Sequence, residues 1–231
     1  MITDVKLFII KVLNKRNINL KSFFFVGMLA SVLFGCASKP TNTAIDIHPA
    51  TQQLNLQVQH LQSLADIHSF ELNGRIAVQM EKHGFSAITH WQHTQNQDVM
   101  EIFSPFGSKL AVINRTDKLV KLITSDKKEL QASSVEVLTE QVLAFKLPLS
   151  GLTDWVLARP SLLGEPPIMI EYDSLGHIIL LSQQGWDIEY SDYKPINNKI
   201  LPSKIFLKSA KLNLKLLIDS WQLSSADKVL P

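Results

Sequence analysis

The chain has 231 residues, of which 45% are hydrophobic and 19% are charged, and this composition excludes a disordered or fibrous protein. Its length suits one domain that can enclose a sizeable core or a ligand cavity, and argues against two large domains. Residues 1–35 hold five of the 23 basic and one of the 21 acidic residues, which leaves 18 basic and 20 acidic residues for the rest. Without a basic excess, this body lacks the positive surface that nucleic acid requires.

The single cysteine, Cys36, follows a segment typical of a bacterial signal peptide. A basic region precedes an apolar run from Ser22 to Gly35, which is shorter than the roughly twenty apolar residues that span a bilayer. Leu33-Phe34-Gly35-Cys36 resembles the lipobox, in which the cysteine is diacylated, exposed by cleavage and acylated on its new amine. The resemblance implies a signal peptide over 1–35 and a lipid anchor on Cys36. Ala37, where aspartate would signal inner-membrane retention, points to the outer membrane. The alternative is an uncleaved anchor with an inert cysteine.

Residues 36–50 are mostly polar and unpatterned, which predicts a lipidated N-terminus followed by a flexible tether. About fourteen such residues have a root-mean-square reach of roughly 20 Å. The folded domain is expected over 51–231. It opens with an amphipathic helix, whose apolar stripe is expected to consist of Leu54, Val58, Leu61 and Ala65.

After His68 the hydrophobic period changes to two, which predicts short antiparallel strands joined by tight turns. The eleven candidate strands lie at about 70–80, 85–93, 98–103, 107–114, 118–124, 128–132, 167–172, 176–182, 185–192, 200–208 and 211–221. Two helices are expected between the sixth and seventh strands. The first carries Val135, Leu138, Val142 and Phe145, and the second carries Leu152, Trp155 and Val156. One mainly β sheet curled around these helices, nearly into a barrel, is the economical architecture.

No catalytic constellation is evident in the sequence. There is no GxSxG, HExxH, P-loop or GxGxxG motif. His90 and His93 fall on opposite faces of a regular strand, so they cannot share a metal. Asp187 and Glu189 share the face opposite Trp186, which predicts a solvated pair. We expect no enzyme, no cofactor and no metal site.

The apolar residues of the strands and helices are candidates for a lipid-binding cavity, although a plain hydrophobic core is the default for such residues. Strand parity places Met100, Ile102, Leu110 and Val112 on the inner face of the middle strands. The candidate cavity residues are Trp91, Met100, Ile102, Leu110, Val112, Leu138, Val142, Trp155, Trp186 and Leu214.

The segment Ser104-Pro105-Phe106-Gly107 joins two predicted strands. Its proline and glycine favour a tight turn that presents Phe106 outward. An aromatic side chain at a loop tip commonly touches a membrane or a partner. Pro105, Phe106 and Gly107 are therefore predicted to form a membrane-contact loop, unless the phenylalanine folds back into the core.

The order and spacing of several short motifs resemble the LolB family of outer-membrane lipoprotein receptors. These motifs are Leu72-Asn73-Gly74-Arg75-Ile76-Ala77-Val78, Trp91-Gln92, Pro105-Phe106-Gly107, Leu147-Pro148-Leu149, Trp155-Val156-Leu157, Gln183-Gln184-Gly185-Trp186, Leu201-Pro202, and Leu214-Lys215-Leu216 with Trp221. Phe106 departs from the leucine expected in the family's Pro-Leu-Gly turn but remains bulky and apolar.

The resemblance implies a half-open β-barrel with a helical lid over an apolar cavity. It implies a monomer that takes acylated lipoproteins from the periplasmic carrier LolA and releases them into outer-membrane lipid without nucleotide hydrolysis. Two other classes stay open at this point: a structural or assembly-helper lipoprotein with a solid core, and a periplasmic lipid hydrolase.

Overall fold

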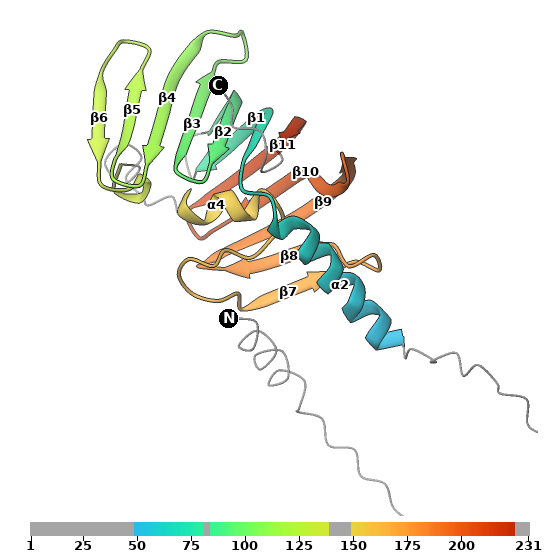
Figure 1. The fold of residues 1–231 in the computed structure, drawn as a ribbon. Coiled ribbons are helices and arrows are strands. Elements are labelled where there is room, and N and C mark those ends of the chain that lie inside the picture. The colour runs from blue at the N-terminus through green and yellow to red at the C-terminus, as the bar shows by residue number, and fades with distance from the viewer. Residues whose placement is uncertain (1–48, 81–83, 139–148, 225–231) are drawn as a thin grey trace, which may run out of the picture. The chain divides into compact units, whose positions relative to one another are not determined.

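A computed structural model describes residues 49–80, 84–138 and 149–224, and Figure 1 shows its fold. The predicted signal peptide, Cys36 and the predicted tether up to residue 48 lie outside the described residues. Among the described helices, none has the length and apolar character needed to cross a membrane.

The described part of the chain is mainly β. In chain order its elements are α2 (Pro49–Ala65), β1 (Phe70–Met80), β2 (Gly84–Thr94), β3 (Gln97–Phe103), β4 (Lys109–Thr116), β5 (Val120–Thr124), β6 (Glu129–Ala132), α4 (Leu149–Trp155), β7 (Met169–Tyr172), β8 (Ile178–Gln183), β9 (Trp186–Ile196), β10 (Lys199–Lys208) and β11 (Leu212–Leu223). Residues 135–138 are also helical. Each of the eleven predicted runs corresponds to one strand, and the predicted helix around Trp155 is confirmed as α4. Val142 and Phe145 of the other predicted helix lie outside the described residues.

All eleven strands form one antiparallel sheet with the order β6-β5-β4-β3-β2-β1-β11-β10-β9-β8-β7. Consecutive strands are neighbours in the sheet except for β6 and β7, and the pairing of β1 with β11 joins the two halves. β6 and β7 occupy opposite edges and are not paired, so the predicted single, unclosed sheet is confirmed.

The alternation of side chains gives the sheet an apolar inner face and a polar outer face. In β11, Leu214 and Leu216 are buried while Lys215 and Asp219 are exposed. α4 packs on the inner face, where Trp155 joins the same hydrophobic cluster as the strand residues (Figure 1). One face of the sheet is therefore covered and the other is exposed to solvent, as is common for antiparallel sheets.

The hydrophobic interior is divided into two clusters. The main cluster joins α2, α4, β1, β2 and β8 to β11, and its most deeply buried members include Leu64, Phe70, Leu72, Trp155, Leu157, Ile178, Leu181, Ile188, Leu201 and Ile205. The edge cluster consists of Val120, Ala132, Val135 and Leu138, with Ile113 and Leu122 packed against it. The boundary between them, which we call the seam, runs along β3 and β4, where Met100 of the main side pairs with Ile113 of the edge side.

Helix α2 confirms the predicted helix, but its buried face differs from the predicted stripe. Leu54, Val58 and Ala65 are exposed, whereas His60 and Leu64 are buried. The spacing of apolar residues alone predicts that stripe. The helix instead turns polar side chains toward the sheet because they have specific partners there.

Those partners lie on the β7–β8 hairpin. The Gln53 Nε2 donates to the backbone oxygen of Asp173 at 2.7 Å. The His60 ring stands edge-on to the His177 ring at 4.7 Å between centroids. Gly176, at φ +85°, allows the turn to approach the helix closely, since a Cβ there would lie 2.5 Å from the Leu56 carbonyl carbon. This docking orders the segment that precedes the sheet.

Burial, together with the positive charge that His177 can carry, lowers the pKa of His60 from 6.5 to about 4, while Asp173 opposes the shift. The unfolded chain binds this proton below pH 6.5, but the folded chain does not bind it until about pH 4. The free energy of unfolding should therefore fall as the pH drops through this window, by on the order of 2–3 kcal/mol.

We predict that His60→Phe removes this component, because phenylalanine keeps an aromatic ring against His177 and cannot take up a proton. Denaturant unfolding at pH 7.5 and 4.5, with the unsubstituted chain as the control, measures the difference. An equal loss of stability in both proteins would show that His60 does not carry the pH dependence.

Candidate functional site

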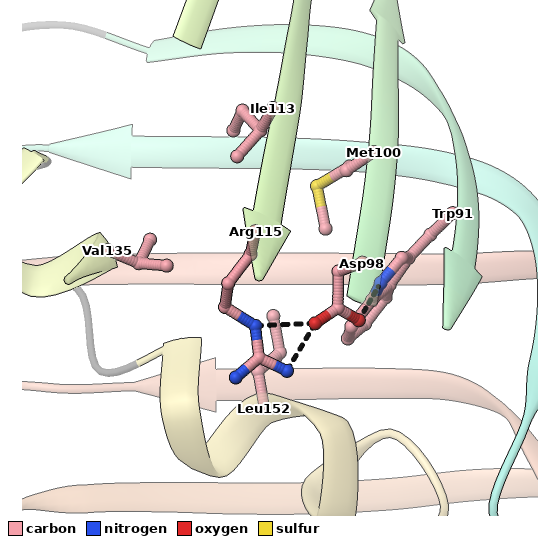
Figure 2. Close-up of a pocket in the computed structure, with 7 residues that line it drawn as sticks. All are labelled: Trp91, Asp98, Met100, Ile113, Arg115, Val135 and Leu152. Carbon is pink, nitrogen blue, oxygen red and sulfur yellow. Dashed lines mark hydrogen bonds and ion pairs between the residues drawn. The ribbon is translucent and has the colours of Figure 1, made fainter. Parts of the chain in front are cut away.

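A pocket lies at the seam between the two hydrophobic clusters (Figure 2). It is lined by Trp91 of β2, Asp98 and Met100 of β3, Ile113 and Arg115 of β4, Val135 of the 135–138 helical segment, and Leu152 of α4. Its volume is about 20 Å³, which is room for about one water molecule. The pocket is therefore a narrow gap between packed elements and not an open cavity.

Strand register brings the lining residues together. Trp91 pairs with Met100, and Met100 pairs with Ile113, so these three side chains form one row across the inner face. Asp98 pairs with Arg115 two residues further along the same strands. Because side chains alternate along a strand, a spacing of two keeps both rows on the same face.

The Asp98 carboxylate forms the polar end of the pocket (Figure 2). Its Oδ1 accepts a hydrogen bond from Trp91 Nε1 at 2.8 Å and lies 2.7 Å from His93 Nδ1. Its Oδ2 accepts from Nε of Arg115 at 2.5 Å and pairs with Nη2 of the same guanidinium. An ionised carboxylate only accepts, so the hydrogen-bonded arrangement requires a proton on Nδ1 of His93.

Burial alone would raise the pKa of the Asp98 carboxyl. The hydrogen bond and charge of His93, the charge of Arg115 and the Trp91 hydrogen bond together hold this pKa below its usual value. The side chain of Asp98 is 9% exposed and that of Arg115 is 31% exposed. The seam thus carries a buried, internally neutralised ion pair at the edge of an apolar gap.

The structure brings together only some of the predicted cavity residues. Trp91 and Met100 line the pocket, and Ile102 lies on the same face between Thr89 and Ala111. Leu138 is buried in the edge cluster. Trp155, Trp186 and Leu214 are buried in the main cluster and do not line this pocket. Val142 lies outside the described residues.

The prediction that Leu110 and Val112 share the inner face with Met100 is wrong. Val112 pairs with Glu101, so it lies on the outer face, and Leu110 stands at a β-bulge and is 41% exposed. The inner positions of β4 are Ala111 and Ile113. The four apolar residues from Leu110 to Ile113 give no alternation, and the bulge shifts the register that hairpin counting assumes.

Sequence reasoning also missed Asp98, Ile113 and Arg115, and it placed Val135 and Leu152 on helices without assigning them to a site. One feature of the sequence does indicate the ion pair. Asp98 stands at the parity of Met100 and Ile102, where a lone carboxylate in an apolar row requires a buried partner.

The turn between β3 and β4 has the predicted form. Gly107 N donates to the backbone oxygen of Ser104 at 2.9 Å, and Ser104 N donates to that of Ser108 at 2.8 Å. Gly107 adopts φ +86°, which favours glycine. Pro105 and Gly107 are exposed, and Phe106 is 95% exposed, so this ring does not fold back into the core.

The described residues contain no group of three or more His, Cys, Asp or Glu arranged to hold a metal ion. His90 and His93 lie on opposite faces of β2, as predicted, and His93 is committed to Asp98. Asp187 and Glu189 are exposed on the outer face of β9, as expected for a solvated pair.

A family model described as "Outer membrane lipoprotein LolB" matches residues 68–221. An outer-membrane lipoprotein LolB of Nitrosomonas europaea is 33% identical over 197 residues, which cover 83% of this chain and 88% of that protein. One of Nitrosococcus oceani is 37% identical over 163 residues, which cover 70% and 80%. Among solved structures, a LolA superfamily protein of Nitrosomonas europaea aligns with a TM-score of 0.47 and 12% identity over 78% of this chain and 94% of that chain. The chain therefore belongs to the outer-membrane lipoprotein LolB family, whose members are lipid-anchored receptors of lipoprotein localisation and not enzymes.

Proposed function

We propose that this chain, anchored in the outer membrane through acylated Cys36, accepts the acyl chains of lipoproteins from the periplasmic carrier LolA and releases them into outer-membrane lipid. The observation that carries the proposal is the seam, where the inner face of the sheet divides into two separately packed clusters. An acyl chain that enters there parts the edge cluster from the main cluster and leaves the packing within each one intact.

Apolar burial supplies the driving force for such a transfer. Each methylene removed from water contributes about 0.8 kcal/mol, so ten methylenes contribute about 8 kcal/mol. A lipoprotein therefore needs an apolar host at every stage of its transfer. The lining of the seam is non-directional and apolar except at Asp98 and Arg115, which suits chains that must be released again.

The small volume of the pocket favours one alternative, a structural lipoprotein with a solid core. A gap of about 20 Å³ is far below the roughly 300–1,000 Å³ of pockets that enclose a whole small ligand. The two candidates differ in one respect: the receptor opens at the seam in the presence of acyl chains, and the structural protein does not.

A transfer assay tests the proposal directly. The chain without its signal peptide and lipid is mixed with a carrier loaded with a radiolabelled lipoprotein, and the two proteins are separated. We expect the label to move to this chain in the absence of nucleotide. If the label stays on the carrier at all ratios of the two proteins, the proposal is wrong and the structural lipoprotein is the remaining candidate.

A matched pair of neighbouring substitutions locates the binding face. Ile113→Asp puts a charge among the apolar side chains of the seam, where an acyl chain would have to pack against it, and should lower acyl-chain uptake by more than about tenfold. Val112→Asp, one residue away on the outer face, should leave uptake unchanged. Displacement of a fluorescent acyl probe measures both variants, with circular dichroism as the control for folding. Equal uptake by the two variants would place the acyl chain away from the inner face of β4.

The exposed ring of Phe106 is expected to act in delivery and not in loading. Phe106→Glu replaces apolar insertion into the bilayer with the cost of moving a charge toward the acyl region, which is commonly a few kcal/mol. Loading from the carrier should persist, while release of the lipoprotein into liposomes should fail. Phe106→Leu should transfer normally.

Leu162 supplies the control for this position because it is also 95% exposed, in the segment between α4 and β7. Leu162→Glu should leave delivery intact if the β3–β4 turn is the membrane contact. A Phe106→Glu protein that unfolds or cannot be loaded would assign the ring to the core or the binding site.

Acylation of Cys36 is tested separately, since this residue is the only thiol of the chain. Cys36→Ala should abolish incorporation of labelled palmitate and leave an unprocessed or unanchored protein. Cys36→Ser provides a second variant of nearly the same size. Label retained on either variant would show that the anchor lies elsewhere.

A further inference from the structure

The ion pair at the seam is unusual for a site that binds only hydrocarbon. Removing two charges from water is costly, and apolar residues of similar volume are often at least as stable. Asp98 and Arg115 nevertheless occupy the inner face, in line with Met100 and Ile113. Their position suggests a role toward the ligand in addition to packing.

The guanidinium of Arg115 has donors left over. Of its five N–H bonds, one from Nε and one from Nη2 are directed at Asp98, so the second hydrogen of Nη2 and both hydrogens of Nη1 remain. Figure 2 shows Nη1 directed away from the carboxylate. Among the described residues, none accepts a hydrogen bond from this nitrogen. Arg115 is also the more exposed partner, at 31%, so it stands at the rim of the gap.

The neutrality of the pair selects the kind of acceptor that it suits. Asp98 compensates the charge of Arg115 and has both oxygens occupied, so it cannot receive a proton from the ligand. A fixed cationic donor whose charge is already compensated by a neighbouring carboxylate favours a neutral carbonyl oxygen over a phosphate or a carboxylate, whose desolvation would stay uncompensated. The acyl group of a lipoprotein carries such carbonyls where each chain joins its glyceryl ester or its amide.

We propose that Arg115, held in place by Asp98, donates a hydrogen bond from Nη1 to an acyl carbonyl of the bound lipoprotein, and so fixes how deeply the chain enters the seam. This inference rests on the proposed function and deepens it, because it names the chemical group that distinguishes an acylated lipoprotein from simple hydrocarbon. Asp98 is a positioning residue in this account, since it acts through Arg115.

The test compares two synthetic lipopeptides that differ only at these carbonyls. One carries an S-diacylglyceryl cysteine with ester-linked C16 chains, and the other carries the matching dialkyl ether. Each competes against a photoreactive acyl lipopeptide for crosslinking to the mature, acylated protein in nanodiscs. We expect the ester to compete about tenfold better than the ether, as expected for one hydrogen bond from a charged donor.

The double variant Asp98→Asn/Arg115→Met removes both charges together, so that neither is left buried without a partner. In this variant the two lipopeptides should compete equally, so that the ratio of their half-maximal competing concentrations is about one. The half-maximal concentration of the ether should stay unchanged. Arg115→Lys keeps the charge next to Asp98 but lacks the planar fork, and should lower the ratio to an intermediate value. This single variant keeps the test informative if the double variant does not fold.

A second Arg–Asp pair of the same sheet supplies the control. Arg75 donates from Nη2 to Asp219 at 2.8 Å on the exposed outer face. Arg75→Met/Asp219→Asn should leave the ratio at its original value. Equal competition by ester and ether in the unsubstituted protein, or a ratio that the Asp98/Arg115 variants do not change, would overturn the role of Arg115. Failure of both lipopeptides to compete would instead overturn the proposed function itself.

Discussion

The pairing of the first strand with the last one determines the rest of this fold. β1 and β11 pair from Phe70 with Leu223 to Met80 with Leu212, and this ladder joins the two halves of the sheet. A shift by one residue would turn the apolar set of either strand to the outer face. Gly74 stands where the register shifts, and a Cβ at this position would lie 2.5 Å from the carbonyl oxygen of Leu217. The close approach of the two backbones therefore requires a glycine.

That pairing also explains why a helix covers the inner face. Because β1 and β11 meet in the middle, β6 and β7 are left at opposite edges, although they follow each other along the chain. The connection between them must pass from one edge to the other, and α4, one of its two described helical segments, packs on the inner face. The topology thus supplies a helical segment above the seam without a separate domain.

The strands could be predicted from the sequence, whereas part of the candidate site could not. In β9 and β11 apolar and polar residues alternate along the chain, as expected for strands with one buried face. This alternation is absent from Leu110 to Ile113, where all four residues are apolar. The sequence there does not indicate which side chains face the seam. The contacts of α2 could not be predicted from the sequence for a different reason. His60 and Gln53 are polar residues whose partners lie more than a hundred positions away in the chain. Local patterns indicate which residues are buried, but they do not indicate which distant groups contact a buried polar side chain.

A narrow seam suits a host that must also release its ligand. Opening the gap requires the side chains that line it to move apart, so part of the energy gained by burying an acyl chain offsets the packing that the chain displaces. A preformed wide cavity would have no such opposing contribution and would hold the chain more tightly. In the proposed function, the closed seam therefore keeps binding weaker than insertion into the bilayer, and the lipid moves onward without any input of chemical energy.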